Sequence, residues 1–146
     1  MSTYYTNEAA FELPDDELGA LVDRTVHVLE GETPSGGELG VVALRTRIPT
    51  GKSLLDLVRL HEDHERRALR AYAVLDSDEV EIDDGPALRV RASWRGESGM
   101  VFQEQAHLAR RGLWLVFSVT APLEERELAT RTMDRLTSTL HTRKEP

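Results

Sequence analysis

The segment over residues 113–119, Leu-Trp-Leu-Val-Phe-Ser-Val, most constrains the fold because it is apolar on both sets of alternating positions. Every second residue from Leu113 is apolar, and Trp114 and Val116 add apolar side chains to the other set. A strand with one solvated face alternates apolar and polar residues, so this strand needs cover on both faces of its sheet. Residues 40–44, Gly-Val-Val-Ala-Leu, show the same two-sided pattern.

The rest of the chain predicts further strands and two helices. Gly, Pro and Asp clusters separate predicted strands at residues 7–13, 24–29, 39–47, 72–75, 80–82, 87–95, 100–109 and 113–120. The first three strands are expected to form one meander, and residues 84–86 are expected to form a turn. This order predicts a single α+β domain over residues 1–146, built on an antiparallel sheet.

The two helices are predicted from local signals. Ser53 can cap a helix that runs to about residue 69. The second helix is predicted to begin near Pro122, because the fixed φ of proline suits a first helical turn. Its apolar face is expected to contain Ala129, Met133, Leu136 and Leu140.

The sequence leaves open how two helices cover a sheet that is apolar on both faces. If both helices pack on one face, the other face must meet a helix at another position in the sequence, another subunit or a ligand. If one helix lies on each face, the result is an ordinary sandwich. Periodicity does not assign a helix to a face, so both arrangements stay open, and the first leads to the hypothesis of a partner-binding sheet.

The charge balance and cysteine content exclude several classes of function. The chain has 26 acidic and 18 basic residues, a net charge of -8, and no cluster of basic and aromatic residues that would suit a nucleic acid. It has no cysteine for a disulfide or a thiolate metal site. Residues 1–20 lack a secretory signal pattern, and no apolar run approaches the roughly 18 residues of a membrane span. A cytoplasmic protein without direct membrane insertion is therefore expected.

Two short motifs resemble catalytic loops but lack a required residue. Residues 51–53, Gly-Lys-Ser, resemble the end of a phosphate-binding loop, yet Thr46 stands where the first glycine of that loop is needed. Residues 96–99, Gly-Glu-Ser-Gly, resemble a hydrolase elbow, but Met100 occupies the second glycine position. A helix cap and a hairpin turn explain these residues better, and no enzyme activity is expected.

Metal sites are also not expected. His61 and His64 lie three residues apart on the first predicted helix, but a third ligand is not evident. The acidic residues between positions 76 and 84 lack the spacing of a calcium-binding loop, and solvated strand ends explain them. The sequence therefore predicts no cofactor.

Five stretches of the chain, by their order and spacing, carry a resemblance to a known family. They are residues 5–14, 23–29, 55–69, 85–94 and 102–122. Together they resemble the Mog1/PsbP-like α+β sandwich, and within it the DcrB-related group that includes the Eag proteins, chaperones of type VI secretion effectors. The resemblance implies a homodimer whose concave sheet faces bind the apolar N-terminal helices of an effector before export. Such binding uses no cofactor.

The resemblance also implies four partner-binding residues. Val26 and Val28 correspond to two alternating aliphatic residues of the family's groove, although plain core packing would explain them equally. Gln105 corresponds to a polar groove residue whose amide could pair with a polar group of a bound helix; the alternative is a solvent-facing strand residue. His61 stands where the family pattern suggests a glutamine, which departs from the pattern and introduces pH sensitivity.

Two functions from different classes follow. The first is an Eag-like chaperone that shields the transmembrane helices of a secretion effector. The second is a general DcrB-like scaffold that engages a folded partner through the same sheet. The chaperone requires an apolar helical segment in its partner, whereas the scaffold requires a polar surface, so the chemistry of the partner distinguishes them.

Overall fold

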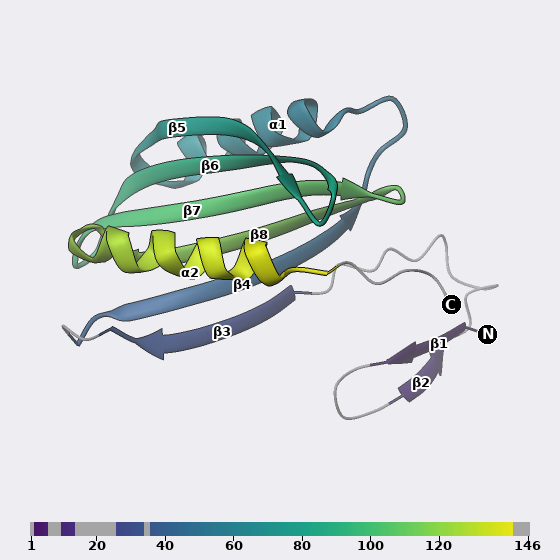
Figure 1. The fold of residues 1–146 in the computed structure, drawn as a ribbon, viewed down its shortest axis with the longest axis horizontal. Helices are drawn as coiled ribbons and strands as arrows, with labels where there is room; N and C mark the ends of the chain where they lie inside the picture. The colour runs from purple at the N-terminus through teal and green to yellow at the C-terminus, as the bar shows by residue number, and fades with distance from the viewer. Residues whose placement is uncertain (1, 6–9, 14–25, 34–35, 142–146) are drawn as a thin grey trace.

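The computed structural model describes residues 2–5, 10–13, 26–33 and 36–141, with backbone alone for residues 2–5, 10–13 and 26–29. Among these residues, four strands precede the first helix, and four more separate it from the second (Figure 1). The elements are β1 (Ser2–Tyr5), β2 (Ala10–Leu13), β3 (Val26–Glu32), β4 (Glu38–Arg47), α1 (Leu54–Ala68), β5 (Arg70–Ile82), β6 (Gly85–Gly96), β7 (Gly99–Arg110), β8 (Leu113–Pro122), a 3-10 turn (Leu123–Glu125) and α2 (Arg126–Thr139).

Six strands form one antiparallel sheet in the order β3-β4-β8-β7-β6-β5, and β1 and β2 form a separate two-stranded sheet. The expected N-terminal meander is therefore wrong. The strand predicted at 7–13 corresponds to β2, which pairs with β1 and not with β3; residues 7–9 lie outside the described residues. An alternating pattern identifies a strand but not its partner.

The strands predicted at 72–75 and 80–82 are one strand, β5, at the edge of the large sheet. The acidic residues between them continue the strand, because an edge strand carries charged side chains without burying them. The following turn consists of Asp83 and Asp84, with φ of 51° and 59°, so the turn expected at 84–86 lies one residue earlier. Two positive φ values suit the tight hairpin between β5 and β6.

Both predicted helices are present. The Ser53 hydroxyl accepts from the Asp56 amide at 3.2 Å, and the Asp56 carboxylate accepts from the Ser53 amide at 3.0 Å, which closes a reciprocal cap at the start of α1. The second helix follows a 3-10 turn after Pro122, slightly later than predicted. Its expected apolar face is correct, since Ala129 and Met133 are fully buried and Leu136 and Leu140 pack beside them.

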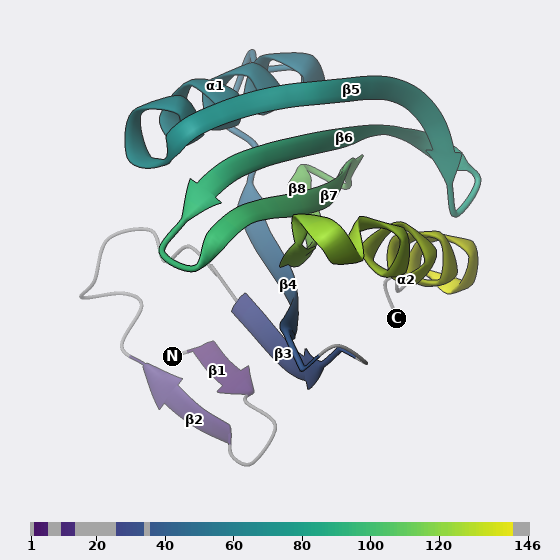
Figure 2. The ribbon, with the colours of Figure 1, turned by 90° about the vertical axis from the view of Figure 1, so that its left-hand side faces the viewer.

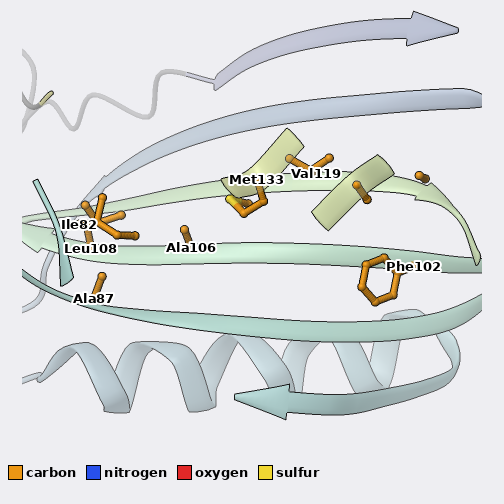
Figure 3. Close-up of a cluster of buried hydrophobic side chains, with 9 residues drawn as sticks. Ile82, Ala87, Phe102, Ala106, Leu108, Val119 and Met133 are labelled. Carbon is orange, nitrogen blue, oxygen red and sulfur yellow. The ribbon is translucent and has the colours of Figure 1, made fainter. Parts of the chain in front are cut away.

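The helices lie on opposite sides of the large sheet (Figures 1 and 2). On the α2 side, Met133 packs against alternate residues of the strands (Figure 3), and the cluster comprises Ile82, Ala87, Phe102, Ala106, Leu108, Val119, Ala121, Ala129 and Met133. On the α1 side, a smaller cluster comprises Val58, Leu88 and Val90, with Leu54 and Val74 beside it. The arrangement with both helices on one face is therefore wrong.

The sheet is wider than the helices that cover it. Among the described residues, α1 packs mainly on β5 and β7, and α2 mainly on β7 and β8. The two-sided apolar pattern of β8 reflects its central position between these layers. On the α1 side, β3 and β4 extend beyond the helix, so the sandwich formed by the described residues is incomplete there.

A buried carboxylate joins α2 to the sheet. Glu104 on β7 is fully buried and accepts from Arg89 at 2.8 Å, from Arg91 at 2.6 Å and from the Thr130 hydroxyl of α2 at 3.0 Å. Arg89 also reaches Asp134 on α2 at 2.7 Å. The ion pairs raise the pKa of Arg91, and they raise that of Arg89 despite its burial. A buried charge with this many partners fixes the position of the helix.

Candidate partner-binding face

The face of the large sheet that carries α1, here called the α1 face, brings the predicted site residues together. Backbone register places Val28, Val42, Ser118, Gln105 and Val90 in one row across five strands. The next row holds Val26, Leu44, Val116, His107 and Leu88. Residues opposite each other on antiparallel strands share a face. Residues from β3 and β7, distant in sequence, therefore belong to one surface.

A chain of hydrogen bonds, here called the polar row, crosses this face. The Trp114 indole N–H donates to Nδ1 of His107 at 3.2 Å, and Nε2 of His107 meets the Gln105 carbonyl oxygen at 2.8 Å. Gln105 then donates to Gln103, and Gln103 donates to the Thr120 hydroxyl at 3.1 Å. Because an indole nitrogen only donates, Nδ1 of His107 must accept, and the proton of the neutral ring lies on Nε2.

The middle of the polar row is buried. Gln105 is 1% exposed and His107 is 0% exposed, so the alternative of a solvent-facing Gln105 is wrong. Burial lowers the pKa of His107 to about 3, and the neighbouring His61 contributes in the same direction. The row therefore contains a neutral imidazole at physiological pH.

His61 of α1 stands over the start of the polar row. Its ring lies edge-on to His107 and to Trp114, with ring centroids 5.5 Å and 6.2 Å apart. Burial lowers the pKa of His61; the Glu65 carboxylate, 3.9 Å from Nε2, opposes this shift, and His64 adds to it. The predicted residue therefore contributes an aromatic contact between α1 and the sheet.

The other end of the polar row opens into a cleft. Thr120 and Val42, both half-buried, line a cleft of about 610 Å³ at one end of the sheet. Its lining comes from β3, β4, the β6–β7 turn and the end of β8, and the residues are Glu30, Gly37, Glu38, Gly40, Val42, Gly96, Glu97, Ser98, Gly99, Met100, Val101, Thr120, Ala121, Pro122 and Glu124. A concave surface with apolar groups and a few polar groups is typical of a binding site.

The structure adds four residues that sequence reasoning missed, namely Gln103, His107, Trp114 and Thr120. A signal was present: polar residues recur at positions 103, 105 and 107, within a strand that also places apolar residues at 102, 106 and 108. This pattern predicts a polar stripe on one face of the strand. The partner of each residue depends on register with β8, which sequence does not give.

Two features are absent from the residues that the structure describes. These residues contain no group of three His, Asp or Glu side chains that could hold a metal ion. None of the helices within the described ranges is long and apolar enough to cross a bilayer. The α1 face instead combines aliphatic strand residues with amide and hydroxyl groups, an arrangement suited to contact with another polypeptide.

Comparison with known proteins extends this description. The sequence matches the model of the DcrB family over residues 8–139. A search of curated protein sequences found no match.

Solved structures share the fold at low sequence identity. A protein of unknown function, PA94 from Pseudomonas aeruginosa, superposes with a TM-score of 0.80 at 18% identity over 99% of each chain. The PsbP protein of Synechocystis sp. PCC 6803, CyanoP, gives 0.59 at 11% identity over 80% of this chain and 82% of its own. LpqN of Mycobacterium tuberculosis, involved in cell envelope biogenesis, gives 0.51 at 13% identity over 81% and 80%. The expected PsbP-like α+β fold is confirmed.

Proposed function

Because this chain belongs to the DcrB family, and because its α1 face joins apolar strands to a polar row, we propose that it is a protein-binding chaperone. Its client in this proposal is a type VI secretion effector, whose apolar N-terminal helices it shields before export. In this proposal the chaperone acts in the cytoplasm, because the client helices must be covered before they reach a membrane. It acts as a homodimer, as the resemblance to the Eag proteins implies.

The part of the α1 face formed by β3 and β4, on which neither described helix packs, is the observation that carries this proposal. Val42 and Leu44 on β4 are only half-buried, and the register places Val28 and Val26 beside them on the edge strand. An apolar helix loses contact with water when it lies on such a surface, which stabilises the complex by roughly 25 cal/mol for each Å² of apolar area buried. Binding of a helix in an apolar groove is a common mode of peptide recognition.

The polar row supplies hydrogen-bonding groups, which an apolar surface alone lacks. Transmembrane segments carry occasional Ser, Thr or Asn side chains, which need hydrogen-bond partners when water is removed. Gln103 and Thr120 are half-buried and stand next to the aliphatic strands. The buried Gln105 and His107 act in this proposal as positioning residues, because they orient Gln103 and Thr120 and do not themselves reach the client.

Affinity capture with two forms of the client tests the proposal. The chain is co-expressed with an effector encoded beside it, either intact or without its apolar N-terminal segments. We expect capture of the intact effector alone. Equal capture of both forms would refute the chaperone and support a scaffold that engages a folded partner.

Charge substitutions locate the contact. Val28→Asp and Val42→Asp are expected to abolish capture, because each places an unpaired carboxylate against the apolar client. Leu75→Asp is the matched control, since Leu75 is 55% exposed on the opposite edge strand, β5. Thermal melting of each variant separates loss of binding from loss of folding. Full capture by two folded variants with Asp at positions 28 and 42 would exclude the α1 face as the site.

A further inference from the structure

The cleft at the end of the α1 face has a floor and a rim of different chemistry. Glycines, Val42, Val101 and Pro122 form much of the lining, while four glutamates from different segments of the chain, Glu30, Glu38, Glu97 and Glu124, contribute carboxylates. Among the described residues that line this cleft, none is a Lys or an Arg. The cleft is therefore apolar below and acidic around its edge.

The four carboxylates have no cation within the described part of the chain. All four glutamates are exposed, and none of them takes part in an ion pair with a described residue. Two exposed acids elsewhere in the molecule are compensated: Asp134 pairs with Arg89, and Asp76 with Arg91. Four like charges around one concavity produce a local negative potential that attracts a cation.

A glycine keeps the cleft open at the point where it meets the polar row. Backbone register places Gly40 between Glu30 of the rim and Thr120 of the polar row. A Cβ atom built at Gly40 would meet no other atom within 4 Å. The backbone of a second polypeptide can therefore approach β4 closely here, and a large side chain at this position would fill the space.

We infer that the cleft binds the basic end of the client helix, with a Lys or Arg side chain paired to the rim carboxylates while the apolar part of the helix lies on the α1 face. This inference rests on the proposed function and adds a charge requirement to it. Lys and Arg commonly flank transmembrane segments, and their long aliphatic stems can cover apolar surface while the charged group reaches the rim. The chain thus recognises the boundary of the client segment as well as its apolar length.

Two synthetic peptides test the inference directly. Both contain the same Leu/Ala helix of about 20 residues; one carries two Lys at each end, and the other carries two Glu. Fluorescence anisotropy measures their binding to the full chain at low salt. We expect the Lys peptide to bind roughly tenfold more tightly, as a few exposed ion pairs would give, and we expect 0.5 M salt to remove most of the difference.

Charge-matched variants distinguish the effect of the rim carboxylates from the effect of the net charge of the chain. Replacement of the four rim glutamates by Gln is expected to remove the preference for the Lys peptide. The control replaces four exposed acids outside the cleft, Asp78, Glu79, Glu81 and Glu127, by the corresponding amides, and it should retain the preference. A preference that persists in the rim variant, or that disappears equally in the control, would overturn the inference.

A steric variant tests occupation of the cleft itself. Gly40→Leu should weaken binding of the Lys peptide at least tenfold, because the new side chain would protrude into the cleft. Gly31→Leu on β3 is the control, since a Cβ at Gly31 also meets nothing within 4 Å and Gly31 does not line this cleft. Unchanged binding by Gly40→Leu would refute the inference. Equal binding of both peptides would overturn the charge requirement alone, whereas no binding of either peptide would overturn the proposed function.

Discussion

The buried His107 predicts a specific loss of stability in mild acid. Burial lowers its pKa from 6.5 to about 3 in the folded chain, whereas the unfolded chain keeps a value near 6.5. As the pH falls below 6.5, His107 therefore becomes protonated in the unfolded state but stays neutral in the native state. The contribution of His107 to stability is complete above that pH and declines by about 1.4 kcal/mol for each pH unit down to about 3.

The pKa values of His107 in the folded and unfolded states determine how much stability is lost. Between pH 7 and pH 5 the free energy of unfolding should fall by about 2 kcal/mol from His107 alone. For a domain of this length, that change lowers the melting temperature by about 6 °C. His61 adds to the loss, because its pKa is also lowered. Urea unfolding monitored by Trp fluorescence at pH 7, 6 and 5 measures the slope.

Replacement of His107 by Gln tests whether this residue causes the loss of stability with falling pH. His107→Gln retains a donor toward Gln105 and an acceptor toward Trp114, but it cannot titrate. This variant should lose most of the pH dependence between 7 and 5, while His64→Gln, an exposed position on α1, should retain it. If the His107→Gln variant loses as much stability on acidification as the wild type, the reasoning about the buried imidazole is wrong.

Three further predictions concern the fold and are measured by urea or thermal unfolding. Glu104→Ala should cost about 3 kcal/mol, because it removes the buried carboxylate that two partly buried arginines share. Asp134→Ala, at a residue whose side chain is 57% exposed, should cost less than about 1 kcal/mol; equal costs would show that the buried network is not the cause. Met133→Ala should cost about 2–5 kcal/mol by opening a cavity under α2, and a loss below about 1 kcal/mol would contradict the packing described. Hydrogen bonds from Ser53 lower the pKa of Asp56 below its ordinary value of 3.8. The difference in stability between wild type and Asp56→Asn should therefore be present above about pH 4 and disappear as the pH falls below 3.8. A difference that persists at pH 2 would contradict the cap.

Local signals in the sequence account for the elements that were predicted well. The Ser53 cap and the spacing of Leu54, Leu57 and Val58 define α1, because both features act within a few residues. The same holds for the buried face of α2 and for the hairpin between β7 and β8. These features need no knowledge of what lies across the fold.

Features that depend on distant partners could not be predicted. The sequence shows that β8 needs cover on both faces, but not that α1 and α2 supply it from opposite sides. Gln105 appears in the sequence as a polar strand residue that could face solvent. Alternation within β7 places it beside Gln103 and His107, but only the register with β8 places Ser118 opposite it. Its burial also determines the expected effect of mutation: Gln105→Ala should cost about 1–3 kcal/mol in the free energy of unfolding, because Gln103 and His107 each lose a hydrogen-bond partner.

Trp114 fixes the orientation of the side-chain amides of Gln105 and Gln103. Its indole cannot accept, so neither glutamine can rotate its amide by half a turn without setting two donors or two acceptors against each other. The chain of bonds thus has a direction, and it terminates at the Thr120 oxygen, which receives a hydrogen from Gln103 and keeps its own hydrogen to give. A visiting carbonyl group at the mouth of the cleft can therefore accept the Thr120 hydroxyl hydrogen, and a visiting N–H can donate to the remaining lone pair of the same oxygen.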